Sequence, residues 1–132
     1  MPNWCNNTTY IECLDKDTQK KIHDIVNKDE HGFKFSNFHP LPEDEQDNWY
    51  DWQIANWGTK WDTCHSNTEN YGKKGYQITY DTAWGPALNA LKKLSSLFPN
   101  AVISTEYEEF GCDFAGVMVF HKGKTVFEKD WT

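Results

Sequence analysis

Arginine is absent from this sequence: all thirteen basic residues among its 132 are lysines, and twenty acidic residues leave a net charge of −7. Arginine supplies the two parallel donors that grip phosphates and guanine edges. A chain that lacks them, and whose net charge repels polyanions, is a poor candidate for binding duplex nucleic acid. An acidic surface can instead dock on a basic protein, and a single lysine could still hold a small phosphate ligand.

Long apolar runs are absent as well. No stretch reaches the roughly twenty apolar residues that a membrane-spanning helix needs. Asparagines at positions 3, 6 and 7 interrupt any apolar signal segment near the start. We therefore expect a cytoplasmic protein of one domain, with reduced thiols and no membrane partner.

The sequence also lacks the spacings of common metal and catalytic motifs. The cysteines form no CxxC pair and the histidines no HExxH. A zinc site around Cys64 and His65 is less favoured than separate thiols, and Cys5 or Cys112 would act as a nucleophile only beside a base. There is no GxSxG, P-loop or dinucleotide fingerprint. We expect no metal, no cofactor and no catalytic residue, and favour a protein that is not an enzyme.

Carboxylates cluster at two places. Glu106, Glu108, Glu109 and Asp113 surround an expected turn, where paired carboxylates can do acid–base work or hold a metal. The simpler interpretation is a solvated hairpin end. The second run, at residues 43–47, is interpreted as a solvated helix start or as a patch for a basic partner.

Aromatic side chains are abundant: they make up 16% of the residues and include seven tryptophans. Aromatic rings bury large areas with few flexible torsions, so they can make a short chain firm. Seven indoles are more than one small core usually holds. We therefore expect some of them to line a surface pocket.

The apolar spacing predicts alternating strands and helices. Two helices are expected, one from a cap at Asp15 or Asp17 to residue 27, and one from Pro86, at its first position, to residue 98. Residues 42–75 are interpreted as a tryptophan-rich insertion, in which a helix opens at Pro42 and 63–75 form a loop. Strands are expected at residues 8–14, 33–35, 76–82, 101–109, 114–121 and 125–129, with a hairpin turn at Lys122-Gly123.

This order of elements predicts an α+β ferredoxin-like fold. In that fold a split βαβ unit forms an antiparallel sheet with two helices on one face. The last two expected strands would add one extra C-terminal hairpin. The whole chain of residues 1–132 is then a single domain.

Several local patterns occur in a fixed order: MPNWCNN at residues 1–7, NWGTKWD at 56–62, TAWGP at 82–86, LSSLFP at 94–99 and YEEFG at 107–111. In this order they resemble the YubB-like ferredoxin-like domain family, which is carried on plasmids and phages. The resemblance covers the start and the residues from 56 onward, and is slight in residues 15–50. It implies a ferredoxin-like fold and an origin in a mobile genetic element, and it carries over no catalytic residues.

The NWGTKWD segment is the strongest candidate for a binding site. Two indoles and one ammonium could stack a base and hold its phosphate, with a glycine allowing a sharp turn. The alternative is a rigid turn whose tryptophans fill the core while the lysine packs by its stem. The candidate residues are Trp57, Gly58, Thr59, Lys60, Trp61 and Asp62.

Two other segments are candidates. The first seven residues either anchor the first strand or place Asn3 and Asn6, beside Trp4, where their amides read the polar edges of a ligand. Residues 82–86, which include Trp84, either form an ordinary strand–helix junction or offer free N–H groups to an anion.

Three functional hypotheses remain open. The first is a non-enzymatic accessory protein of a phage or plasmid that counters a host defence by binding a defence protein, with Trp49 or Trp52 as an aromatic anchor. The second is a protein that sequesters a small nucleotide-like signal in a pocket of Lys60, Trp84 and the two NWGTKWD tryptophans. The third is an enzyme acting on such a nucleotide.

Overall fold

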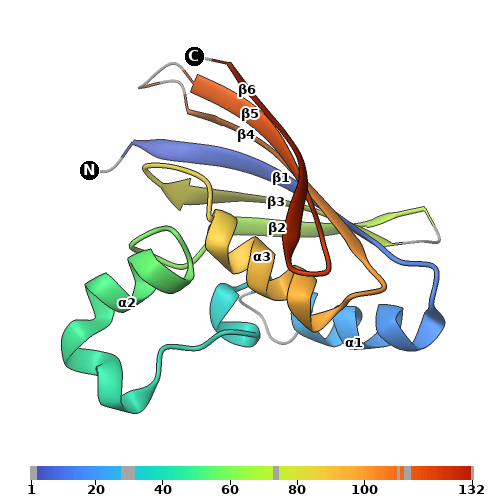
Figure 1. Ribbon diagram of the computed structural model, residues 1–132, viewed down its shortest axis with the longest axis horizontal. Helices are drawn as coiled ribbons and strands as arrows, with labels where there is room; N and C mark the ends of the chain where they lie inside the picture. The colour runs from blue at the N-terminus through green and yellow to red at the C-terminus, as the bar shows by residue number, and fades with distance from the viewer. Residues whose placement is uncertain (1–2, 28–31, 73–74, 110, 112–113, 132) are drawn as a thin grey trace.

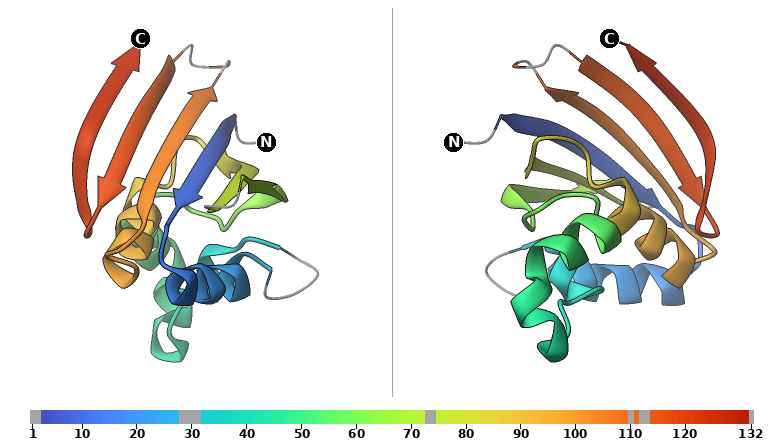
Figure 2. Two further views of the ribbon diagram at one scale, coloured as in Figure 1. Left: turned by 90° about the vertical axis from the view of Figure 1, so that its right-hand side faces the viewer. Right: turned by 60° about the vertical axis from the view of Figure 1, so that its left-hand side comes forward.

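Six strands form one antiparallel sheet, and the helices lie on one of its faces (Figures 1 and 2). The computed structural model describes residues 3–27, 32–72, 75–109, 111 and 114–131. In space the strands follow the order β2-β3-β1-β4-β5-β6. Their bounds are β1 Trp4–Glu12, β2 Cys64–Tyr71, β3 Gly75–Ala83, β4 Val102–Glu109, β5 Phe114–His121 and β6 Lys124–Trp131.

The connecting helices complete a split βαβ unit. β1-α1-β2 and β3-α3-β4 are its two halves, and β5 and β6 form a hairpin outside β4. The predicted fold class is therefore confirmed. No helix in the described part of the chain is long and apolar enough to cross a membrane. The bounds are α1 Lys16–Val26, α2 Trp49–Asn56 and α3 Leu88–Leu97, with short 3-10 segments η1 Phe35–Asn37 and η2 Glu43–Asn48 before α2.

The hydrophobic core lies between the helices and the inner face of the sheet. β1 alternates because its odd-numbered residues from Cys5 to Ile11 are buried on that face. In α1 and α3 the buried residues recur every three or four positions, as one side of a helix requires. The most buried apolar members include Ile11, Ile22, Val26, Ile78, Leu91, Leu94, Ile103 and Phe120.

Two predicted elements are wrong. The short strand expected at residues 33–35 does not form, because η1 begins at Phe35 and the rings of Phe33 and Phe35 enter the core 5.9 Å apart. The loop expected at residues 63–75 contains β2, so the last part of the predicted insertion belongs to the sheet. β2 is hard to recognise because an edge strand is largely exposed and can be polar on both sides.

The ends of the elements agree with the prediction in part. Asp15 caps α1, where its carboxylate accepts a hydrogen bond from the Thr18 N–H at 3.1 Å. α3 begins at Leu88, so Pro86 precedes the helix and does not occupy its first position. The hairpin turn is confirmed, with φ of 54° at Lys122 and 77° at Gly123.

A buried polar network crosses the inner face of the sheet. The hydroxyl oxygens of Thr9 and Tyr80 lie 2.7 Å apart, and those of Thr9 and Thr105 lie 2.8 Å apart. Burial raises the pKa of the Tyr80 hydroxyl far above its usual range. Burial likewise raises the pKa of the Cys5 thiol to about 12. Because a thiol attacks only as a thiolate, this environment does not support Cys5 as a nucleophile.

We expect the free energy of unfolding to fall as the pH rises above about 9. Unfolded Cys5 and Tyr80 lose their protons near their usual pKa values of about 8.5 and 10, whereas the folded groups keep them. Each group then removes about 1.4 kcal/mol per pH unit until its folded pKa is reached.

Urea unfolding at several pH values between about 8 and 11 measures this slope. Tyr80→Phe should make the slope shallower, whereas Tyr50→Phe, at an exposed tyrosine, should leave it unchanged. Equal slopes in the two variants would contradict a role for the buried hydroxyl.

Candidate functional site

Four rings and one ammonium gather at one end of the sheet, where β1 and β2 begin and β3 ends. The ring of Trp4 lies 6.2 Å from that of Trp61 and 5.9 Å from that of His65. The Lys60 ammonium lies 4.2 Å from the Trp61 ring and 5.6 Å from the Trp84 ring. We call these five residues the aromatic surface.

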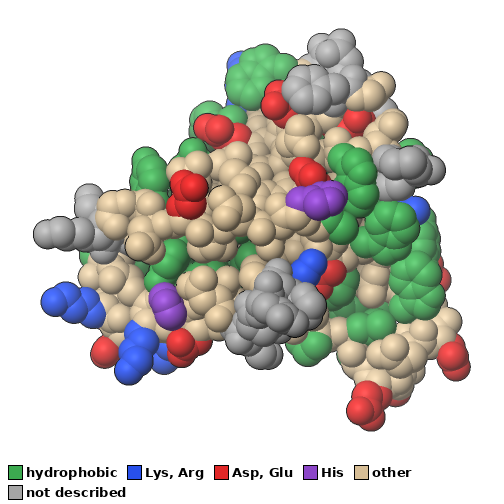
Figure 3. Space-filling view, turned by 180° about the vertical axis from the view of Figure 1, so that it is seen from behind, with side chains coloured by type: hydrophobic (Ala, Val, Ile, Leu, Met, Phe, Trp, Pro, Cys, Tyr) green, Lys and Arg blue, Asp and Glu red, His purple; other side chains and the backbone are tan. Residues whose placement is uncertain are grey.

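The aromatic surface is open to solvent. Trp84 is 54% exposed and Trp61 is 36% exposed, whereas Trp4 is half-buried. Figure 3 shows hydrophobic side chains gathered along one side of the molecule, from beside a histidine towards a group of acidic side chains. Contiguous exposed aromatics of this kind mark an interaction site.

The backbone of Trp84 is strained. Its φ is 74°, in the left-handed region that a bulky residue rarely adopts. The Trp84 N–H donates to the Asn3 carbonyl at 2.9 Å, and the Thr82 hydroxyl donates to the Gly85 carbonyl at 2.6 Å. These bonds hold a conformation that costs on the order of 1–3 kcal/mol. The strain supports a function for the exposed ring, because such outliers cluster at functional sites.

His65 is a second strained member of the aromatic surface. Its φ is 57°, and it lies at an irregularity in the β2–β3 pairing between Cys64 and Asn67. A bulge of this kind redirects a side chain. Here it places His65 Nδ1 3.0 Å from Asp81 Oδ2 and the ring edge-on to Trp4. The carboxylate therefore orients the imidazole while the ring stays exposed.

A pocket of about 330 Å³ adjoins the aromatic surface. Tyr50 and Ile54 of α2 form one wall, and Lys60 and Trp84 form another. The pocket extends the exposed apolar area to Trp49, whose ring lies 5.8 Å from that of Tyr50. The aromatic surface and α2 thus make one continuous face.

Gly58, which also lines the pocket, lies close to the start of α3. Its φ is 90°, and a Cβ atom there would lie 3.4 Å from the backbone nitrogens of Leu88 and Asn89. The close approach is fastened by the Ala90 N–H, which donates to the Trp57 carbonyl at 3.1 Å. The left-handed φ favours glycine at this position, and the predicted sharp turn is present.

The two tryptophans that flank Gly58 do not form the predicted stacking pair. Trp57 is 3% exposed and lies in the core, where its indole N–H donates to the His39 carbonyl at 2.9 Å. Trp52 packs edge-on against it at 5.8 Å and is half-buried, whereas Trp49 is exposed. Of the NWGTKWD indoles, Trp61 alone reaches the aromatic surface.

The polar residues of NWGTKWD hold the loop in place. The Asp62 carboxylate accepts hydrogen bonds from the N–H groups of Phe35 at 2.6 Å and Ser36 at 3.1 Å, and so caps η1. The buried Thr59 hydroxyl donates to the Trp61 carbonyl at 2.6 Å. Asp62 and Thr59 were candidate ligand-binding residues, but their side chains make hydrogen bonds within the protein that stabilise the loop.

The asparagines near the start of the chain lie in three different environments. Asn3 contributes its carbonyl to the backbone of Trp84, next to the aromatic surface. Asn6 is exposed on the face of the sheet opposite the helices, in a different pocket. Asn7, which the sequence did not single out, is buried and donates to the Thr82 hydroxyl at 2.9 Å. β1 begins at Trp4, so this part of the chain is anchored in the sheet.

The predicted carboxylate cluster divides between the two faces of β4. Glu106 and Glu108 are exposed, whereas Glu109 is 1% exposed and accepts a hydrogen bond from the Gly111 N–H at 2.7 Å. Cys112 and Asp113 lie outside the described residues. Among the residues that the structure does describe, no group of three or more His, Cys, Asp or Glu could hold a metal ion.

Sequence reasoning missed three residues of this region. Tyr50 and Ile54 lie four positions apart on α2, a spacing that places them on one side of the helix and could have identified them. His65 was considered only as a zinc ligand with Cys64. Its partner Asp81 is sixteen residues away and is reached only through the irregular β2–β3 pairing.

A family model described as the ferredoxin-like domain in Api92-like protein matches residues 56–132, more than half of the chain. The chain belongs to this Api92-like family. The match includes Lys60, Trp61, His65 and Trp84, whereas Trp4 and the α2 wall of the pocket lie before it. None of the curated proteins matches the chain.

A crystal structure of the Api92-like family has a similar fold. It is that of the protein api92 from Yersinia pseudotuberculosis, with a TM-score of 0.57 and 16% identity over 64% of this chain. The aligned part covers 30% of the api92 chain, so the likeness extends over less than a third of that protein. At this identity the likeness shows the fold alone.

Because Trp84 has a strained backbone, we expect a glycine variant at this position to be more stable than an alanine variant, the reverse of the usual order within a strand. Trp84→Gly should be about 1 kcal/mol more stable than Trp84→Ala, because both remove the ring and only glycine relieves the left-handed backbone. Urea unfolding measures the difference. At Thr79, an exposed residue within β3, the alanine variant should be the more stable one. Equal stability of the two Trp84 variants would show that residue 84 is not held in this conformation.

Proposed function

We propose that this protein is a non-enzymatic accessory protein of a phage or plasmid that binds and inhibits a host defence protein in the host cytoplasm. The resemblance of its motifs to the YubB-like family supports the mobile-element origin. The observation that carries the binding role is Trp84, a large ring held exposed on a strained backbone beside Trp61 and Lys60.

The extent of the apolar face favours a protein partner. It continues from Trp4 through Trp61 and Trp84 to Tyr50 and Ile54, which is wider than one stacked base requires. Protein interfaces are enriched in tryptophan and tyrosine, and their central rings carry most of the binding free energy.

The margin of this face is acidic. η2, with Glu43, Asp44 and Glu45 in its first turn, leads directly into α2, which supplies Tyr50 and Ile54. With a net charge of −7 for the whole chain, a partner with a basic surface would be steered towards this side. Trp49 begins α2 and is exposed, so it remains available as a second anchor.

A panel of bacterial strains, each carrying one defined defence system, tests the proposal. Expression of the protein should restore phage plating on at least one strain by tenfold or more. The double variant Trp61→Ala/Trp84→Ala should lose this effect and the affinity for the purified defence protein, because each ring is expected to contribute at least about 1 kcal/mol.

Tyr71→Ala is the matched control, since it removes an exposed aromatic ring from the sheet outside the aromatic surface. Thermal unfolding of each variant checks that it remains folded. The proposal fails when no strain regains plating, or when the double variant restores plating as well as the natural chain does.

A small nucleotide-like signal is the second candidate ligand, and the position of Lys60 favours it. The ammonium lies over Trp61 and near Trp84 at the mouth of the pocket, where a phosphate and a base could bind together. Quenching of tryptophan fluorescence by mononucleotides, lost in Lys60→Ala, would support this candidate over the first. Recovery of the nucleotide unchanged after long incubation would argue against turnover.

A further inference from the structure

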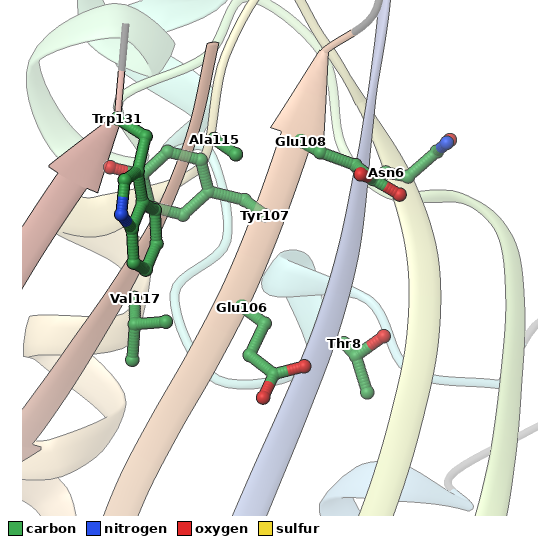
Figure 4. Close-up of a pocket in the computed structure, with 9 residues that line it drawn as sticks. Asn6, Thr8, Glu106, Tyr107, Glu108, Ala115, Val117 and Trp131 are labelled. Carbon is green, nitrogen blue, oxygen red and sulfur yellow. The ribbon is translucent and has the colours of Figure 1, made fainter.

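The face of the sheet opposite the helices carries a groove of its own, of about 370 Å³. β1 contributes Asn6 and Thr8, β4 contributes Glu106 and Glu108, and Trp131 of β6 stands at the far side. Figure 4 shows the carboxylates extending from β4 towards β1 and the indole standing beside Ala115 and Val117 of β5. This groove is distinct from the aromatic surface, because the two share no residue.

The carboxylates of the groove make no ion pair in the part of the chain that the structure describes. Within the described residues no ammonium lies within 4.0 Å of Glu106 or Glu108. Lys129 on β6 pairs with Val117, which pairs with Glu106, so this lysine is on the same face two strands away from Glu106 but does not line the groove. Burial raises the pKa of the neighbouring Tyr10 hydroxyl, and the Glu106 carboxylate raises it further. The groove therefore favours a cation.

The floor of the groove is apolar. Ala115 pairs with Trp131 on β6 and with Glu108 on β4, and Val117 pairs with Glu106. The small Ala115 side chain leaves the 52% exposed indole room to contact a ligand. A lysine or arginine side chain has the matching shape, with an apolar stem for the indole and valine and a charged head for the carboxylates.

The spacing of the carboxylates matches that of alternate side chains in an extended peptide. Glu106 and Glu108 are two residues apart on one strand, which separates their positions by about 6.6 Å along the strand. Alternate side chains of a second extended chain have the same spacing. We propose that this groove binds an extended segment of a protein partner with basic residues at alternate positions.

An NMR titration of the full chain with a capped Arg-Ser-Arg pentapeptide, flanked by glycines, tests the groove. The amide signals of residues 115–117 should shift in a saturable way. Glu106→Gln/Glu108→Gln should weaken binding about tenfold, because it removes both charge partners of the peptide. Trp131→Ala should weaken it severalfold by removing the contact with the stems.

The matched control is Glu12→Gln/Glu69→Gln, which removes two charges from positions on the same sheet that lie outside the groove. It should leave the affinity within about twofold of the natural chain. Absence of saturable shifts, or equal weakening in the control, would overturn the proposal. Equal affinity for spermidine would overturn the assignment to a peptide. The aromatic surface and its proposed role are unaffected by any of these results.

Discussion

The carboxylate of Asp62 fixes the loop that precedes β2, and the position of the aromatic surface depends on it. The carboxylate accepts hydrogen bonds from the backbone N–H groups of Phe35 and Ser36, which ties the loop to η1. η1 is itself held in place because the Phe35 ring is buried in the core. The Thr63 hydroxyl adds a bond to the Phe33 carbonyl at 2.6 Å. Trp57 is buried at the start of the loop and Asp62 is bound at its end, and between them the Trp61 ring lies at the surface beside the Lys60 ammonium.

The strained residue Trp84 lies where the pairing of β1 and β3 ends. β1 pairs with β3 up to Trp4 and Ala83, and the next backbone bond runs from Trp84 to the Asn3 carbonyl. This bond and the Thr82 hydroxyl bond to Gly85 contribute about 1 kcal/mol each, against a cost on the order of 1–3 kcal/mol for a left-handed bulky residue. Because the Trp84 ring is more than half exposed, core packing contributes little to offsetting this cost. Recognition of a partner gives a reason for a ring in this position that folding alone does not.

The sequence predicts the parts of the fold whose signals are local. The alternation in β1 and β3, the cap at Asp15 and the turn at Lys122 follow from neighbouring residues and are present. β2 was missed because its polar residues suit the exposed edge of a sheet and give no apolar alternation.

The burial of Trp57 and the exposure of Trp61 could not be predicted from their spacing. They are the same residue type four positions apart, and contacts with η1 and α3, distant in sequence, send one inward and leave the other at the surface. For the same reason His65 and Asp81 meet only once the strands are paired. The candidate site was therefore predictable as a segment and not as a set of side chains.

The absence of arginine bears on which partner suits the aromatic surface. Lys60 is the cation placed between Trp61 and Trp84, and its contacts with the rings contribute about 0.5–1 kcal/mol at an exposed site. A phosphate that draws the ammonium away loses this contribution and also meets the repulsion of a net charge of −7. A protein that covers the rings leaves the lysine where it is and strengthens its contacts by removing water. The arrangement of charges therefore favours a protein partner over a nucleotide at this site.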